Sequence, residues 1–106
     1  GFVLVDPLYV SYIEKVGLKN LLHTTEGRKY VISRTLNEIE KMLSGKGFFR
    51  CHQSFLIYVG NIREIRGAEF GKLHMAVMTD GSEVPVSRGN YQELKERLTG
   101  TDVTYI

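Results

Sequence analysis

Residues 73–86 read Leu-His-Met-Ala-Val-Met-Thr-Asp-Gly-Ser-Glu-Val-Pro-Val. The central Asp80-Gly81-Ser82 is a strong turn signal, and strand-forming residues precede and follow it. We therefore expect a β-hairpin with strands at residues 73–79 and 83–86. Pro85 has no N–H group to donate to a ladder, so the second strand should lie at the edge of its sheet. This stretch predicts an antiparallel, mainly β fold.

Short segments with the composition of strands occur along the rest of the chain. Asp6-Pro7 separates the first two of them, and Glu26-Gly27 is a two-residue break typical of a hairpin. The additional strands are expected at residues 2–5, 9–16, 19–25, 28–33, 48–50, 54–59 and 62–66. Together with the hairpin at residues 73–86, they make strands the dominant element of the fold.

Two short helices are expected between the strands. Thr35-Leu36-Asn37-Glu38 is a capping box, and the apolar residues that follow it recur at helical spacing up to Gly45. Ser87 is the expected N-cap of a second helix that ends at Gly100. Its apolar face would consist of Tyr91, Leu94 and Leu98. The sequence thus predicts a mostly β domain with two short α-helices.

The composition is that of one ordinary globular domain. The chain has 106 residues, of which 42% are hydrophobic and 25% charged, and we expect a single domain over residues 1–106. No apolar run approaches the ~18–20 residues of a membrane span, so no membrane association is expected. Cys51 is the only cysteine, which excludes an internal disulfide and agrees with a reducing cytoplasm. The net charge of +2 is too small to identify a partner.

Enzyme chemistry has little support in the sequence. Cys51 and His52 are adjacent, and neighbouring residues of a strand point to opposite faces, so they should not form a catalytic dyad. The histidines are not at ligand-like spacing, and no glycine-rich phosphate loop is present. We expect no enzyme activity, no metal site and no cofactor. A small hydrolase built on Cys51 or His52 stays an alternative, which an accessible and reactive thiol would favour.

Positive charge is concentrated in the middle of the chain. Between Lys46 and His74 there are five lysines and arginines against two acidic residues. Charge alone favours a solvated sheet face over a nucleic-acid contact as the explanation. Both interpretations stay open.

Four blocks of residues carry a resemblance that the composition does not. In chain order they are Arg34-Thr35-Leu36-Asn37-Glu38-Ile39-Glu40, Phe49-Arg50-Cys51-His52-Gln53-Ser54-Phe55-Leu56, Asn61-Ile62 and Val84-Pro85-Val86-Ser87-Arg88. With these blocks the chain resembles the LytTR DNA-binding domains, the output modules of many bacterial response regulators. The resemblance covers residues 9–98, approximately. It implies an elongated arrangement of small antiparallel β-sheets with two short α-helices.

The resemblance also implies sequence-specific binding of double-stranded DNA by loops that enter successive major grooves. Those loops correspond to residues 18–20, 52–54 and 87–90. The expected base-contacting residues are Arg88, Gln53, Asn20 and Lys19, since arginine pairs with guanine and glutamine with adenine through paired hydrogen bonds. The expected phosphate-contacting residues are Arg50, His52, Ser54, Lys46, Arg63, Lys72, Ser87 and Asn90.

The partners implied by the resemblance extend beyond this domain. They are DNA with imperfect direct repeats, a second copy of the domain on that DNA, and a sensor histidine kinase. The kinase would act through a receiver or other sensory domain preceding Gly1, and the protein would be a cytoplasmic transcriptional regulator. The alternative is a β-rich protein-interaction module that adds a partner strand at its edge near residues 84–86.

Overall fold

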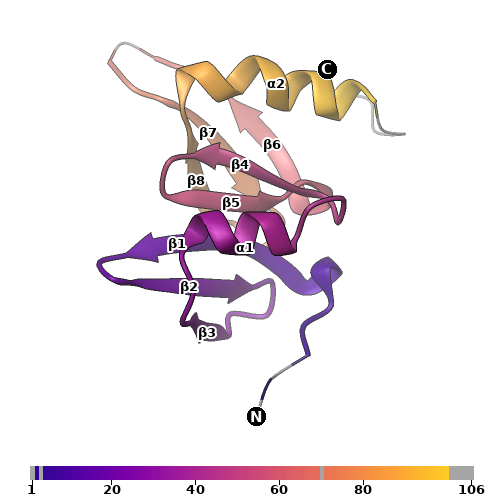
Figure 1. The fold of residues 1–106 in the computed structure, drawn as a ribbon. Helices are drawn as coiled ribbons and strands as arrows, with labels where there is room; N and C mark the ends of the chain where they lie inside the picture. Colours follow the sequence, from indigo (N-terminus) through magenta and orange to yellow (C-terminus); the bar gives the residue numbers. More distant parts are fainter. Residues whose placement is uncertain (1, 3, 70, 101–106) are drawn as a thin grey trace.

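Two antiparallel sheets and two helices make up the fold, seen in a computed structural model that describes residues 2, 4–69 and 71–100 (Figure 1). One sheet has five strands in the order β3-β2-β1-β5-β4, and the other has three in the order β6-β7-β8. The strands are β1 (Val10–Val16), β2 (Lys19–Thr24), β3 (Lys29–Ile32), β4 (Phe48–His52), β5 (Phe55–Tyr58), β6 (Ile62–Arg66), β7 (His74–Met78) and β8 (Glu83–Val86). The helices are α1 (Leu36–Met42) and α2 (Arg88–Thr99), and two 3-10 turns lie at Pro7–Tyr9 and Val59–Asn61.

The β4–β5 hairpin lies between two hydrophobic cores because its side chains alternate between the faces of the sheet. Phe48 and Leu56 face the first core, where residues of β1, β2 and α1 surround them. Phe49, Cys51 and Ile57 face the second core, which β7, β8 and Leu94 of α2 complete. One hairpin thereby joins the two sheets into a molecule with extents of 43 × 31 × 24 Å. This elongated, mostly β arrangement is the predicted fold class.

Local sequence signals locate most elements correctly. The Thr35 hydroxyl accepts a hydrogen bond from the Glu38 amide at 3.1 Å, so α1 begins at the predicted cap. Gly27, in the turn between β2 and β3, has a φ of +85°, which a glycine adopts without strain. β8 is an edge strand, as expected from Pro85.

The expected strand at residues 2–5 is wrong for the described part of that segment. Phe2, Leu4 and Val5 are not in a strand, and the chain continues into the 3-10 turn at Pro7–Tyr9. Phe2 and Leu4 are each 87% exposed, so these apolar side chains are not buried against a neighbouring strand. A strand is stabilised by pairing and burial, and β propensity alone supplies neither.

Candidate nucleic-acid interface

Two backbone hydrogen bonds bring three turns to one edge of the molecule. The Lys15 amide donates to the Ser54 carbonyl at 2.9 Å, which joins the end of β1 to the β4–β5 turn. The Ser87 amide donates to the Cys51 carbonyl, also at 2.9 Å, which joins that turn to the start of α2. We call residues 16–19, 52–54 and 87–90 the loop edge; it lies on the left in Figure 1.

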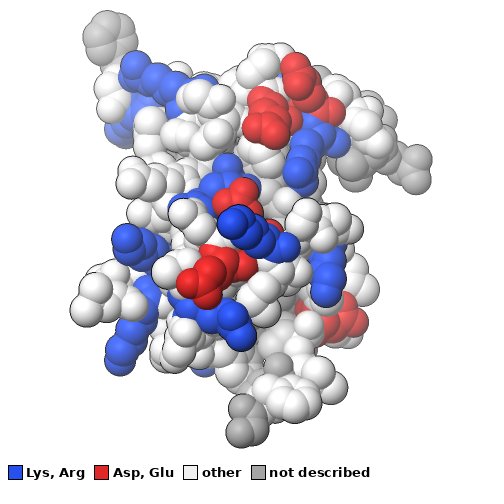
Figure 2. All heavy atoms as spheres, viewed as in Figure 1, with Lys and Arg blue, Asp and Glu red and all other residues white. Residues whose placement is uncertain are grey.

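Arg88, Gln53 and Lys19 project from the loop edge as exposed side chains, one from each turn. Among the described residues, no ion pair joins Arg88, Lys19 or the neighbouring Lys15 to a carboxylate. The left margin of the molecule in Figure 2 correspondingly shows Lys, Arg and uncharged atoms, while the acidic side chains visible in this view lie toward the centre and right. Three of the residues predicted to contact bases are thus exposed together.

The start of α2 is organised by side chains predicted to bind phosphate. Asn90 donates through Nδ2 to the Ser87 hydroxyl at 2.6 Å, and that hydroxyl lies 3.4 Å from the Cys51 carbonyl, to which it donates. Ser87 does not cap the helix through its side chain, so the first amides of α2 are left without a side-chain acceptor. The Asn90 and Tyr91 amides donate to the Ser87 carbonyl, so this helix end presents the Arg88 and Gly89 amides and a partial positive charge.

The β4–β5 turn is held partly by a histidine. His52 accepts a hydrogen bond from the Ser54 amide through Nδ1 at 3.0 Å, and its ring lies edge-on to the Phe55 ring with centroids 5.5 Å apart. His52 and Ser54 are half-buried, whereas Gln53 between them is exposed. The turn therefore offers Gln53 to a ligand while its two neighbours are bound to the domain.

Asn20 does not join the exposed set. It is 3% exposed, and its Nδ2 donates to the Arg34 carbonyl. In β2 it shares the inward face with Leu22 and Thr24, because alternate residues of a strand point the same way. In this conformation Asn20 cannot reach a base, so we leave it out of the interface.

Arg50 is likewise engaged inside the domain. Its Nη1 lies 2.9 Å from both Asn37 Oδ1 and Glu40 Oε1, and its Nε donates to the His52 carbonyl at 3.0 Å. A guanidinium with these partners is not free to bind a phosphate. The expected phosphate contact of Arg50 therefore conflicts with its geometry here.

Of the other basic residues expected to bind phosphate, only Lys72 lies on the side of the loop edge. Lys72 precedes β7, whose first residue His74 pairs with Val86 just before the loop edge resumes at Ser87. Lys46 precedes β4 and Gln53 follows it, so the two lie at opposite ends of a five-residue strand that is roughly 16 Å long. Arg63 lies at the corresponding far end of β6. The structure does not bring Lys46 and Arg63 to the loop edge.

Two features of the loop edge region were not predicted from the sequence: the exposed Lys15 beside it, and the full exposure of Leu18, which lies in the first expected loop. Lys15 reaches the loop edge because β1 pairs with β5, and local patterns do not reveal a pairing between segments more than forty residues apart. Leu18 is at the tip of the β1–β2 turn and is 105% exposed. A lone leucine next to Gly17 and Lys19 in a predicted turn was a readable signal of an exposed apolar tip.

Cys51 and His52 do not form a catalytic pair. Cys51 is fully buried, its Sγ lies 3.7 Å from the Phe55 carbonyl, and burial raises the pKa of its thiol to about 12. A thiol that stays protonated at neutral pH is a poor nucleophile. Across residues 2, 4–69 and 71–100, no three His, Cys, Asp or Glu side chains form a group able to hold a metal ion.

The edge of β8 has few donors for a partner strand. The Met78 amide donates to the Ser82 carbonyl, which sets the alternation of backbone hydrogen bonds along β8. The backbone N–H and C=O groups of Val84 and Val86 therefore point toward β7. Those of Glu83, Pro85 and Ser87 point outward. Pro85 has no N–H, and the Ser87 amide is bound to the Cys51 carbonyl. Only the Glu83 amide then faces outward unpaired, which weighs against strand addition here.

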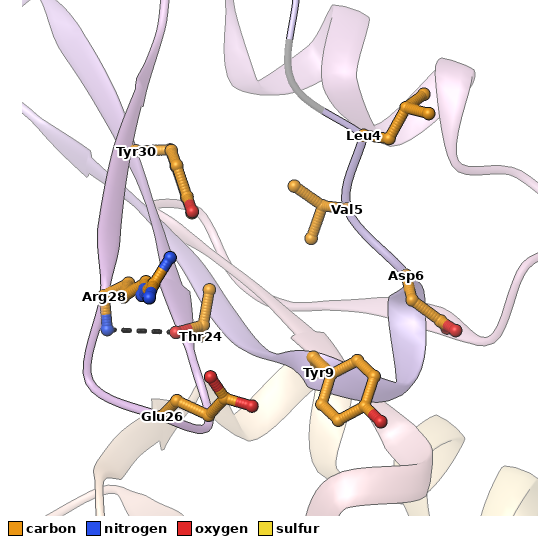
Figure 3. A pocket seen from close by; sticks show the side chains of 8 residues that line it. All are labelled: Leu4, Val5, Asp6, Tyr9, Thr24, Glu26, Arg28 and Tyr30. Atoms are coloured by element: carbon orange, nitrogen blue, oxygen red, sulfur yellow. Dashed lines mark hydrogen bonds between the residues drawn. The ribbon is translucent and has the colours of Figure 1, made fainter.

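A second surface feature lies far from the loop edge. An open pocket between the N-terminal segment and the β2–β3 turn is lined by Leu4, Val5, Asp6, Tyr9, Thr24, Glu26, Arg28 and Tyr30 (Figure 3). The Thr24 hydroxyl in this pocket is already bound by the Arg28 amide at 2.9 Å. In the part of the chain that the structure describes, no helix is long and apolar enough to cross a membrane.

Known proteins of similar sequence are regulators of transcription and sensory transduction. The chain is 40% identical over 102 residues to the sensory transduction protein LytT of Bacillus subtilis, covering 92% of this chain and 40% of that protein. It is 30% identical over 97 residues to the transcriptional regulatory protein YpdB of Escherichia coli K12, covering 91% of this chain and 39% of that protein. The chain therefore spans about 40% of the length of these relatives.

A solved structure and a family model agree with these relatives. The LytTr DNA-binding domain of a putative methyl-accepting/DNA response regulator from Bacillus cereus superposes with a TM-score of 0.76 at 29% identity, covering 95% of this chain and 90% of that one. The model of the LytTr DNA-binding domain matches residues 1–99. The chain belongs to the LytTr DNA-binding domain family.

Proposed function

We propose that this domain binds double-stranded DNA sequence-specifically through the loop edge, as the output module of a bacterial transcriptional regulator. The observation that carries the proposal is the convergence of three turns, tied by the bonds from Lys15 to Ser54 and from Ser87 to Cys51. Arg88, Gln53 and Lys19 are exposed there, with no acidic partner among the described residues. DNA binding itself follows from family membership.

In this proposal Arg88 and Gln53 read base edges in the major groove. A guanidinium binds guanine O6 and N7 with two hydrogen bonds, and a glutamine amide binds adenine N6 and N7. Lys19 adds a third basic contact from the β1–β2 turn. The long extent of 43 Å exceeds the ~34–36 Å of one DNA turn, so an elongated domain of this size suits contacts in successive grooves.

Phosphate contacts position the domain without reading sequence. Lys72, the first amides of α2, and the Ser87 and Asn90 side chains beside them are suited to this role. His52 and Ser54 would approach the backbone from the neighbouring turn. Anions bind favourably at a helix N-terminus, so in this proposal the start of α2 binds one phosphate.

The wider regulatory setting is part of the same proposal. The relatives are named as sensory transduction and response regulator proteins, and the chain spans about 40% of the length of the first of them. We infer that a receiver or sensory domain, phosphorylated by a sensor histidine kinase in the cytoplasm, accompanies this one. Two such domains on imperfect direct repeats would gain affinity because the second binding event is intramolecular.

Selection from random-sequence duplexes, read at two salt concentrations, tests the proposed function. Enrichment of a repeated motif, with affinity that falls as salt rises, is the expected result. Weak salt-dependent binding with no enriched motif would contradict base reading. No binding at low salt would contradict DNA recognition by the isolated domain altogether.

A further inference from the structure

All three guanidinium nitrogen atoms of Arg50 donate hydrogen bonds to partners within the domain. Nη1 binds Asn37 Oδ1 and Glu40 Oε1, each at 2.9 Å. Nε donates to the His52 carbonyl at 3.0 Å, and Nη2 donates to the Gln53 carbonyl in a short hydrogen bond. The side chain is 20% exposed.

These contacts fix the turn that carries Gln53. The carbonyls of His52 and Gln53 are bound by Arg50, and the amide of Ser54 is bound by the His52 ring at 3.0 Å. Consecutive backbone groups of the turn are thus held by side chains. Turns without such bonds are among the more mobile parts of a domain, and a mobile Gln53 would lose entropy on meeting a base.

The other half of the guanidinium is anchored in α1. Asn37 and Glu40 are three residues apart and lie on one face of the helix, where both meet the same nitrogen atom. α1 is itself packed on the sheet through buried Leu36 and Ile39. Arg50 therefore links the exposed turn to a packed helix, and the Glu40 carboxylate offsets its charge.

We propose that Arg50 is a positioning residue, which holds residues 52–54 in the conformation that presents Gln53 to DNA and does not neutralise a phosphate itself. This inference rests on the proposed function, in which Gln53 reads a base. The role requires a planar guanidinium, because its three nitrogen atoms donate to four oxygen atoms in fixed directions. A lysine ammonium lacks that geometry.

The test compares Arg50→Lys, Arg50→Ala and Glu40→Gln with the wild-type domain. For Arg50→Lys, which keeps the charge, affinity for a selected duplex should fall about tenfold, the order expected when hydrogen bonds to a charged group are lost. Affinity for unrelated duplexes and the slope of log affinity against log salt should not change. Glu40→Gln, which removes the anchor charge, should lower specific affinity in the same direction.

A phosphate contact would give a different pattern. Arg50→Lys would then bind like wild type, Arg50→Ala would weaken all duplexes equally and reduce the salt slope by about 0.9, and Glu40→Gln would strengthen binding by freeing the guanidinium. Any of these results would overturn the proposal.

A measurement without DNA separates this inference from the proposed function. Amide exchange and ¹⁵N relaxation of residues 52–54 in the free domain should show a more mobile turn in Arg50→Lys, with the strands of both sheets unchanged. An equally rigid turn would overturn the positioning role whether or not the domain selects a DNA sequence. If the wild-type domain selected no sequence, base reading by Gln53 would be refuted. The exchange and relaxation measurement would still decide whether Arg50 holds the turn.

Discussion

Arg88 and Arg50 show how the surroundings of an arginine decide its use. Arg88 is the first residue of α2, exposed and without an ion pair among the described residues. Arg50 is mostly covered and has four hydrogen-bonding partners. An exposed guanidinium beside a helix N-terminus can meet a base or phosphate, whereas a saturated one can only hold its neighbours.

Replacing Arg88 by alanine should cost about 1–3 kcal/mol of binding free energy on a selected duplex and relax discrimination at one base pair. The loss is confined to the base that the guanidinium contacts, so affinity for unrelated duplexes should change much less. Titrations of single-substitution duplexes would measure both effects, with Gln92→Ala, four residues further along α2, as an exposed control. Unchanged specific affinity in Arg88→Ala would remove Arg88 from the base-reading set.

At the same scale, the buried Cys51 thiol predicts a pH dependence of stability. Burial raises the pKa of Cys51 to about 12, above the ~8.5 of an unfolded cysteine. The folded state therefore retains the proton longer, and the stabilisation is full below about pH 8.5 and is lost as the pH rises toward 12. The free energy of unfolding of wild type should fall toward that of Cys51→Ala by up to about 1.4 kcal/mol per pH unit.

Urea unfolding of the two proteins between pH 8 and pH 10.5 measures this difference, since lysine and tyrosine titrations are common to both. A difference in unfolding free energy that stays constant over this range would contradict the burial of the thiol. Reaction of native Cys51 with a thiol reagent at neutral pH would contradict it as well.

Among the elements, α1 is the shorter of the two α-helices in the described part of the chain, and it both packs into the first core and anchors Arg50. Its seven residues carry Leu36 and Ile39 in the first core and the two partners of Arg50 on the outside. A helix this short is marginal alone and depends on its cap and on packing. Thr35, which accepts the Glu38 amide, is that cap.

Thr35→Ala should lower the free energy of unfolding by about 1 kcal/mol, because the cap hydrogen bond is lost and nothing replaces it. Thr35→Ser keeps the hydroxyl and is the matched variant, expected to lie close to wild type. Urea titration of the three proteins measures the series. Equal stability of the alanine and serine variants would show that the hydroxyl does not cap α1.

At the scale of the whole molecule, the distribution of charge matters more than its sum. The net charge of +2 is small, yet Lys72 lies on the side of the loop edge and Lys46 at the opposite end of β4. Both are exposed lysines in loops that differ in position, and Lys72 also has an exposed ion pair with Glu69 at 3.9 Å. Counterion release depends on which phosphates are neutralised and not on net charge.

Lys72→Ala should weaken binding to all duplexes alike and reduce the slope of log affinity against log salt by about 0.9, the value for one phosphate contact. Lys46→Ala should leave the slope unchanged. Fluorescence anisotropy at four or five salt concentrations provides the slopes. If Lys46→Ala reduced the salt slope and Lys72→Ala left it unchanged, DNA would lie against a different face of the domain.

The boundaries of the elements were predictable where the signal is local. The Asp80-Gly81-Ser82 turn, the Thr35 cap and Pro85 at an edge each depend on residues next to one another in the chain. The inward position of Asn20 was also readable, because Leu22 and Thr24 share its face of the strand. The contacts of Arg50 were not predictable from the sequence, because they depend on α1 packing beside β4. The position of Lys15 was not predictable either, because it depends on β1 pairing with β5.

The central claim is that DNA meets this domain along residues 16–19, 52–54 and 87–90. The most direct test is to record amide chemical shifts of the labelled domain while a selected duplex is added, with an unrelated duplex as control. We predict that the largest specific changes fall in these three segments and that β3 and the outer face of α1 change little. Changes centred on β3, or on the pocket between the N-terminal segment and the β2–β3 turn, would contradict the account.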